Sequence, residues 1–230
     1  MKAVILAGGH GKRLRPLTET VPKPLIEVAG QPIIDWQVKW LMYHGIRSYI
    51  MLVGHLKEKV IEHFDGIKDE LGIEVEYSVE KRPLGTGGAL RNAESMLSGE
   101  KKFFMLNGDT ITNMDIGIMK LDGSIASIAL VPLRSQYGVT HLDGDKIIKF
   151  EEKPMIKDYW MNSGLYLLSS EIFGRLPEEG NIETETFPKL ASERKIIGTR
   201  FPDAYFKGVD SVKDIDEVTS DLKSGRVFGR

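Results

Sequence analysis

A short apolar run followed by a glycine-rich, basic loop constrains this chain more than any other feature. Residues 3–6 (AVIL) predict a buried strand, and glycines follow at positions 8, 9 and 11. Glycine admits positive φ angles and close backbone approach, so the N–H groups of such a loop can turn inward around anionic oxygens. Positive charge surrounds the loop, from Lys12, Arg13, Arg15 and Lys23. The segment therefore predicts a polyphosphate site.

Two common phosphate loops do not fit this segment. A Walker A loop needs a glycine five residues before Gly11 and a Ser or Thr after Lys12, but Leu6 and Arg13 stand there. The dinucleotide fingerprint needs a glycine three residues after Gly11, where Leu14 stands. Both interpretations are excluded.

The segment instead resembles the signature of the sugar-1-phosphate nucleotidyltransferases, G-x-G-x-R-L-x-P-L-T followed by P-K-P-L. Residues 9–18 (GHGKRLRPLT) and 22–25 (PKPL) match it position by position. The resemblance implies that Arg13 and Lys23 are catalytic, holding the β- and γ-phosphates and the α-phosphate of a nucleotide. It also implies a set of nucleotide-binding residues in the loop, namely Leu6, Ala7, Gly8, Gly9, Gly11 and Lys12.

A second glycine segment, residues 80–90 (EKRPLGTGGAL), is expected just before a helix whose N-terminus could face a ligand. It resembles the family's P-L-G-T-[AG]-G, which lies along the base and sugar of the nucleotide. The nucleotide-binding residues implied here are Glu80, Gly85, Thr86 and Gly88. The carboxylate of Glu80 can accept from guanine N1–H and N2–H₂, which favours GTP and leaves CTP, UTP and dTTP open.

Two aspartates are the candidate ligands of a magnesium ion. Asp109 ends an N-G-D sequence after a buried strand, the position of a metal ligand and catalytic residue in the resembled family. Mg²⁺ takes oxygen ligands, usually one or two carboxylates with substrate phosphates. The family's second aspartate would fall at Gly208, and Asp210 stands two residues later. Asp210 is therefore expected to bind the metal, the alternative being that it assists Ser211 in capping a helix.

Three further motifs resemble those around the sugar phosphate. Residues 137–139 (YGV) resemble a segment of the acceptor pocket, 150–154 (FEEKP) match F-x-E-K-P, and 162–166 (NSGLY) match N-S-G-x-Y. The expected sugar-phosphate-binding residues are Gly138, Glu152, Lys153 and Asn162. His10 occupies a variable position of the signature and is assigned no catalytic role.

Strand-like and helix-like segments alternate along the first half, at 48–53, 56–64, 74–79, 89–97 and 102–106. This order predicts an α/β fold, a Rossmann-like three-layer α/β/α arrangement around a mainly parallel mixed sheet. Ligands of such sheets bind beyond the carboxyl ends of the strands. We expect one domain over 1–230, with a nucleotide-binding half at 1–123 and a sugar-phosphate-binding half at 124–230. The resemblance implies the nucleotide-diphospho-sugar transferase fold without a C-terminal β-helix.

Composition narrows the partners. The formal net charge of −2 gives no sign of nucleic-acid binding, and there is no cysteine for a disulfide or thiolate metal site. Neither a signal peptide nor an apolar run of membrane-spanning length is seen, so we expect no membrane partner and a cytoplasmic location. A homo-oligomer is possible.

The resemblance implies a Mg²⁺-dependent transfer of a nucleoside monophosphate from an NTP to a sugar 1-phosphate, giving NDP-sugar and pyrophosphate. The acceptor phosphate is already ionised, so the protein has to position two polyanions and stabilise charge. The segment PLGTGGAL resembles mannose-1-phosphate and heptose-1-phosphate guanylyltransferases. A cytidylyl-, uridylyl- or thymidylyltransferase, or a non-catalytic nucleotide-sugar-binding homologue, remains an alternative. A sugar kinase is disfavoured by the failed Walker A spacing.

Overall fold

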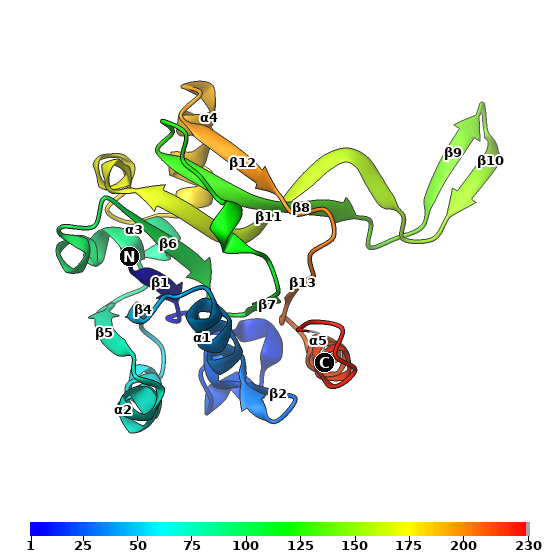
Figure 1. The fold of residues 1–230 in the computed structure, drawn as a ribbon. Coiled ribbons are helices and arrows are strands. Elements are labelled where there is room, and N and C mark those ends of the chain that lie inside the picture. The colour runs from blue at the N-terminus through cyan, green and yellow to red at the C-terminus, as the bar shows by residue number, and fades with distance from the viewer. Residues whose placement is uncertain (229–230) are drawn as a thin grey trace.

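The computed structural model describes residues 1–228, apart from the side chain of residue 157. Its centre is a seven-stranded sheet in the order β12-β8-β11-β6-β1-β4-β5 (Figure 1). The strands are β1 Ala3–Leu6, β4 Ser48–Val53, β5 Glu74–Val79, β6 Lys102–Asn107, β8 Ala126–Arg134, β11 Met155–Ser169 and β12 Ile196–Arg200. Neighbours pair in parallel except at β11, which is antiparallel to both β6 and β8. The predicted mainly parallel mixed sheet is confirmed.

Helices cover both faces of this sheet. Along β1, Ile5 belongs to the apolar cluster that includes helices α1 (Ile33–Tyr43) and α2 (Lys57–Leu71), whereas Val4 belongs to the cluster with α3 (Gly85–Asn92) and α4 (Phe187–Ser192). Adjacent residues of a strand point to opposite faces, so an unbroken apolar run fits a sheet buried on both sides. The three-layer α/β/α architecture is therefore confirmed.

Predicted and observed element boundaries agree best for the buried strands. Strands 48–53 and 74–79 coincide with the prediction, and α2 extends to Leu71, beyond the predicted 56–64. The second glycine segment differs: it was expected to precede a helix, but Gly85, Thr86, Gly87 and Gly88 form the beginning of α3 itself. The short strands β7 (Thr110–Thr112), β12 and β13 (Phe206–Gly208) were not predicted.

Two smaller sheets extend from the core. Strands β7 and β13 form an antiparallel pair that leads into helix α5 (Val212–Lys223), and β2 (Glu27–Val28) pairs with β3 (Gln31–Pro32). Both apolar clusters of the central sheet combine residues before and after position 124. The division of one domain into two functional halves stays a prediction.

A β-hairpin projects from the body of the molecule (Figure 1). Its strands are β9 (Val139–Asp143) and β10 (Lys146–Glu151), and Gly144 in the connecting turn has φ 56°. Apolar side chains on it are exposed, among them Leu142, Ile147 and Phe150. Within residues 1–228, no helix combines the length and the apolar character that a bilayer-spanning segment needs.

Candidate active site

The glycine loop leaves β1 at the carboxyl edge of the sheet and is held by its neighbours. Gly11 has φ 58°, and a Cβ there would lie 2.7 Å from Cγ2 of Thr18. The Thr18 hydroxyl donates a hydrogen bond to the carbonyl oxygen of Gly11 at 2.9 Å. A Cβ on Gly8 would meet Glu80 Oε1 at 3.0 Å, whereas one on Gly9 would meet nothing within 4 Å. The loop therefore packs against the protein at Gly8 and Gly11, whereas space remains beside Gly9.

Lys23 joins the two predicted metal ligands. Its Nζ lies 2.5 Å from Asp109 Oδ2 and 2.6 Å from Asp210 Oδ1, and Arg13 Nη2 lies 2.7 Å from the same Asp210 oxygen. The Lys23 side chain is only 12% exposed, whereas that of Arg13 is 75% exposed. The structure therefore brings Arg13, Lys23, Asp109 and Asp210 into one cluster of alternating charge.

Backbone pairing between the segments that carry the two aspartates brings Asp109 and Asp210 together. Gly108 packs directly on β1, since a Cβ there would lie 2.4 Å from the carbonyl oxygen of Leu6. Gly208 of β13 stands opposite Thr110 of β7, and the N–H of Val209 donates to the carbonyl oxygen of Asp109 at 2.8 Å. Asp210 thus emerges beside Asp109, although the two lie far apart in the sequence.

The carboxylate of Asp210 is not used to cap α5. Ser211 is the N-cap and forms a capping box with Asp214, whose carboxylate accepts from the N–H of Ser211 at 2.8 Å and of Asp210 at 3.1 Å. Asp214 therefore fills the role that the sequence left open for Asp210. The Asp210 side chain faces Lys23 and Arg13 instead.

The cluster fits a hard cation. Two carboxylates that converge on a single ammonium group, from two separate segments, offer oxygen ligands of the kind that Mg²⁺ prefers. Within residues 1–228 no group of three or more His, Cys, Asp or Glu side chains is arranged around a common point. A cation here would need substrate phosphates or water to complete its coordination.

The second glycine segment packs against the chain itself. The N–H groups of Gly87 and Gly88 donate to the carbonyl oxygen of Gly180 at 3.0 and 3.2 Å, and the N–H of Thr86 donates to Asn181 Oδ1 at 3.1 Å. These amides are occupied, so this helix N-terminus does not offer them to an anion as the sequence had suggested. Nucleotide binding by Gly85, Thr86 and Gly88 stays a prediction, and it would have to involve atoms other than these occupied amides.

Glu80 lies between the two glycine segments. It follows β5, is half-buried, and its Oε2 accepts from the N–H of Leu84 at 3.0 Å. Burial raises the pKa of this carboxyl above its ordinary value, and the hydrogen bond from Leu84 opposes that rise in part. Because Oε1 is turned toward Gly8, Glu80 borders the loop where a nucleotide is expected.

A hydrogen-bonded chain links the predicted sugar residue to the second glycine segment. Asn162 Nδ2 donates to the Tyr166 hydroxyl at 2.9 Å, which donates to Glu183 Oε1 at 3.2 Å. The Thr86 hydroxyl donates to the other oxygen of Glu183 at 2.5 Å. Sequence reasoning had left Glu183 without a role, because only the packing of residues 181–186 against α3 shows what it contacts.

The other predicted sugar-phosphate residues lie at the base of the projecting hairpin. A Cβ on Gly138 would meet Phe150 Cζ at 2.5 Å and Glu152 Oε2 at 3.2 Å, so a side chain there would require the exposed Phe150 ring to shift. Lys153 is exposed and has φ 46°. In the described part of the chain, no hydrogen bond or ion pair joins these residues to Lys23 or Asp109.

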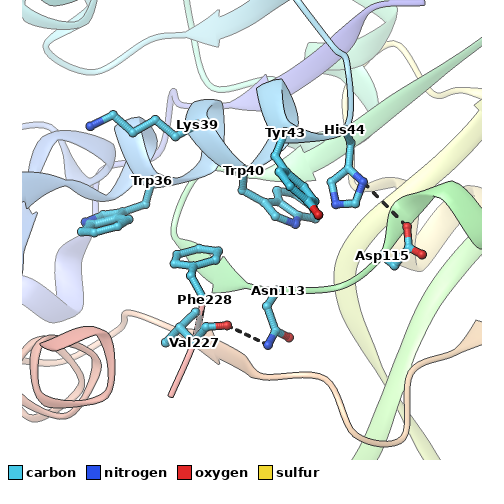
Figure 2. Close-up of a pocket in the computed structure, with 9 residues that line it drawn as sticks. All are labelled: Trp36, Lys39, Trp40, Tyr43, His44, Asn113, Asp115, Val227 and Phe228. Atoms are coloured by element: carbon cyan, nitrogen blue, oxygen red, sulfur yellow. Dashed lines mark hydrogen bonds and ion pairs between the residues drawn. The ribbon is translucent and has the colours of Figure 1, made fainter. Parts of the chain in front are cut away.

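A hollow lies beside α1 and is lined in part by side chains of that helix (Figure 2). It has a volume of about 780 Å³ and is lined by Trp36, Lys39, Trp40, Tyr43, His44, Asn113, Asp115, Val227 and Phe228. None of the predicted site residues within 1–228 borders it.

Gln37, also on α1, supports the candidate site. Its Nε2 donates to the carbonyl oxygens of Asn107 and Thr110 at 2.7 and 2.8 Å, which fixes the backbone on either side of Asp109.

Comparison with known proteins agrees with this geometry. The family described as "Nucleotidyl transferase" matches residues 2–223. The D-glycero-alpha-D-manno-heptose 1-phosphate guanylyltransferase of Campylobacter jejuni subsp. jejuni is 36% identical over 212 residues, which cover 88% of this chain and 94% of that protein. The mannose-1-phosphate guanylyltransferase catalytic subunit beta of Danio rerio is 37% identical over 85% of this chain, which spans 58% of that protein's length.

Solved structures show the same fold. The crystal structure of HddC from Yersinia pseudotuberculosis complexed with GMP-PN superposes with a TM-score of 0.76 at 26% identity, over 96% of this chain and 99% of that one. The inositol-1-phosphate CTP transferase from T. maritima, at 21% identity and a TM-score of 0.74, supports the fold alone. The family inferred from the motifs is thereby confirmed, and this chain belongs to the nucleotidyl transferase family.

Proposed function

We propose that this protein transfers a nucleoside monophosphate from an NTP to a sugar 1-phosphate, releasing pyrophosphate. The observation that carries the proposal is the position of Lys23. Its ammonium group contacts Asp109 and Asp210 beside a glycine loop that carries Arg13. A site with paired carboxylates, a largely buried lysine and an open phosphate loop suits phosphoryl chemistry that proceeds by positioning and charge stabilisation.

The residues of the cluster would act in distinct ways. Arg13 and the amides of Gly9 and Gly11 would hold the β- and γ-phosphates, and Lys23 would neutralise charge that develops at the α-phosphate. A phosphate oxygen of the acceptor attacks the α-phosphorus as the bond to pyrophosphate breaks. That oxygen is already ionised, so no side chain has to remove a proton.

Asp109 and Asp210 would hold Mg²⁺, which supplies charge neutralisation between the phosphates when bound. The Lys23 ammonium group now lies between the two carboxylates. An ammonium group carries three N–H donors, so Lys23 would have one donor for the α-phosphate while it contacts both carboxylates.

GTP is the proposed nucleotide, and a mannose-type sugar 1-phosphate the proposed acceptor. The half-buried carboxylate of Glu80 borders the loop and can accept from guanine N1–H and N2–H₂ when ionised. The relatives from Campylobacter jejuni and Danio rerio are named as guanylyltransferases of heptose and mannose 1-phosphates. Asn162, held by Tyr166, would contact the sugar, and Glu152, Lys153 and Gly138 would close over the acceptor from the hairpin. We further propose a cytoplasmic location and leave a homo-oligomer open.

The nucleotide choice is tested by kcat/KM for four NTPs with mannose 1-phosphate and heptose 1-phosphate. GTP should give the highest value, and Glu80→Gln should erode its lead, because an amide cannot accept both guanine protons as a carboxylate does. Glu70→Gln, an exposed position on α2, is the matched control and should leave the preference unchanged. A native preference for dTTP or UTP would contradict the guanine assignment without contradicting nucleotidyl transfer.

A further inference from the structure

Two histidines lie against each other at the glycine loop. His10 stands between Gly9 and Gly11, and His55 follows β4. Their ring centroids are 4.6 Å apart, with 35° between the ring planes. The His10 ring is exposed and the His55 ring is half-buried. Neither has a part in the proposed reaction, although they border the loop on which that reaction places the triphosphate.

His55 is fixed to both ends of the loop. The backbone N–H of His55 donates to the carbonyl oxygen of Gly8 at 3.2 Å, and the ring atom Nε2 lies 3.2 Å from the carbonyl oxygen of Thr18. A carbonyl oxygen can only accept, so Nε2 carries a hydrogen whether the ring is neutral or charged. The contact with Thr18 therefore fixes the His55 ring beside the loop and against the ring of His10.

The charges around His10 are all positive. Desolvation by the atoms around the ring, and then the neighbouring His55, Lys12 and Arg15, lower the pKa of His10 below its ordinary value. The free protein therefore disfavours the charged form of this ring. An anion bound among the same cations would reverse the balance, because a nearby opposite charge favours the charged form of an imidazole.

We propose that His10, held beside the glycine loop by the ring of His55, is a proton-linked ligand of the pyrophosphate moiety of the nucleotide, an inference that rests on the proposed function. His10 takes up one proton from solvent when the triphosphate or pyrophosphate binds at the loop, and returns it when pyrophosphate leaves. The imidazolium ring adds a cation to the site while the anion is bound, and release of the anion reverses this.

The test is an NMR titration of the imidazole C–H signals with and without inorganic pyrophosphate. The His10 signal is identified by its loss in His10→Gln, which leaves the contacts of His55 with Gly8 and Thr18 in place. Pyrophosphate should raise the pKa of His10 by about one unit or more. His10→Gln should bind pyrophosphate roughly tenfold more weakly at pH 6.5, with a smaller difference at pH 8.5, the scale of one charge-assisted hydrogen bond.

His141→Gln provides the matched control. His141 lies on the projecting hairpin, and its ring contacts Glu151 at 3.2 Å. This variant should bind pyrophosphate as the native protein does at both pH values. The inference is overturned if pyrophosphate shifts the amide signals of Gly9 and Gly11 while the His10 signal titrates as in the free protein. If neither pyrophosphate nor any NTP shifts those amide signals, the proposed function fails, and this inference with it.

Discussion

At the scale of single residues, Lys23 is the point where the charges of the site meet. Its ammonium group is largely buried and contacts two carboxylates that would otherwise repel each other. A largely buried charge that is paired in this way is held firmly in position. Removing it leaves the carboxylates of Asp109 and Asp210 without this compensating cation. Lys23 therefore influences both the free site and the charge that develops at the α-phosphate.

Lys23→Ala should lower kcat by at least ~10²-fold, the scale of losing one preorganised donor in a transition state. Steady-state kinetics with saturating NTP would measure this. Lys59→Ala is a suitable comparison, because its ammonium group donates to the backbone of the same segment at Thr20 without touching a carboxylate, and its kcat should stay near native. A Lys23 variant with a raised KM and native kcat would show that Lys23 serves binding alone.

Asp210 and Asp214 lie four residues apart but have different roles, so variants of the two can be compared directly. Asp210→Asn should remove most activity and raise the Mg²⁺ concentration needed, with little change in Tm, because its carboxylate faces Lys23 and Arg13. Asp214→Asn should instead lower stability by about 1 kcal/mol through the capping box and leave the Mg²⁺ requirement unchanged. Native turnover of Asp210→Asn at limiting Mg²⁺ would exclude Asp210 as a ligand.

At the scale of elements, the sequence predicted what depends on local pattern and missed what depends on pairing. Strands 48–53 and 74–79 were placed correctly, because their apolar content and flanking breaks are local signals. Strands β7 and β13 have three residues each and form by pairing with each other. Segments this short show no periodic pattern of apolar residues from which a strand could be predicted. That pairing brings Asp210 to Asp109, and their proximity was available beforehand only through resemblance to a family.

The beginning of α3 was misplaced for a different reason. Glycines disfavour helix interiors, so the segment was expected to be a loop. In the structure, a Cβ on Gly88 would lie 2.6 Å from the carbonyl oxygen of Glu178, and one on Gly87 would lie 2.9 Å from Pro177 Cδ. The glycines are required because residues 177–180 pack directly on the helix. This tertiary contact has no local signal in the sequence.

Gly88→Ala should therefore destabilise the protein by about 1–3 kcal/mol, the usual cost of overpacking, because a backbone oxygen cannot yield as a side chain can. Urea denaturation would measure the free energy of unfolding. Gly66→Ala in α2 is the matched substitution, since a Cβ there meets nothing within 4 Å, and it should stabilise by up to about 1 kcal/mol. Equal effects at the two positions would contradict the packing explanation.

At the scale of the whole molecule, the sheet gathers the site from distant parts of the chain. The glycine loop follows β1, Glu80 follows β5 and Asp109 follows β6, and β13 brings Asp210 beside Asp109. The carboxyl ends of parallel strands share one edge, which is why the alternation of strands and helices predicted that the candidate segments meet there. The direction of the projecting hairpin (Figure 1) could not be predicted, because β9 and β10 form a separate two-stranded sheet.

The whole protein joins a nucleotide to a sugar 1-phosphate and releases pyrophosphate. The most direct measurement incubates the purified protein with GTP, Mg²⁺ and mannose 1-phosphate or heptose 1-phosphate, and quantifies pyrophosphate and nucleotide-sugar together. We predict equal amounts of the two products, with neither formed when the sugar phosphate is omitted. Formation of GDP and a sugar bisphosphate in place of pyrophosphate, or nucleotide binding without turnover on any NTP and sugar 1-phosphate, would contradict this account.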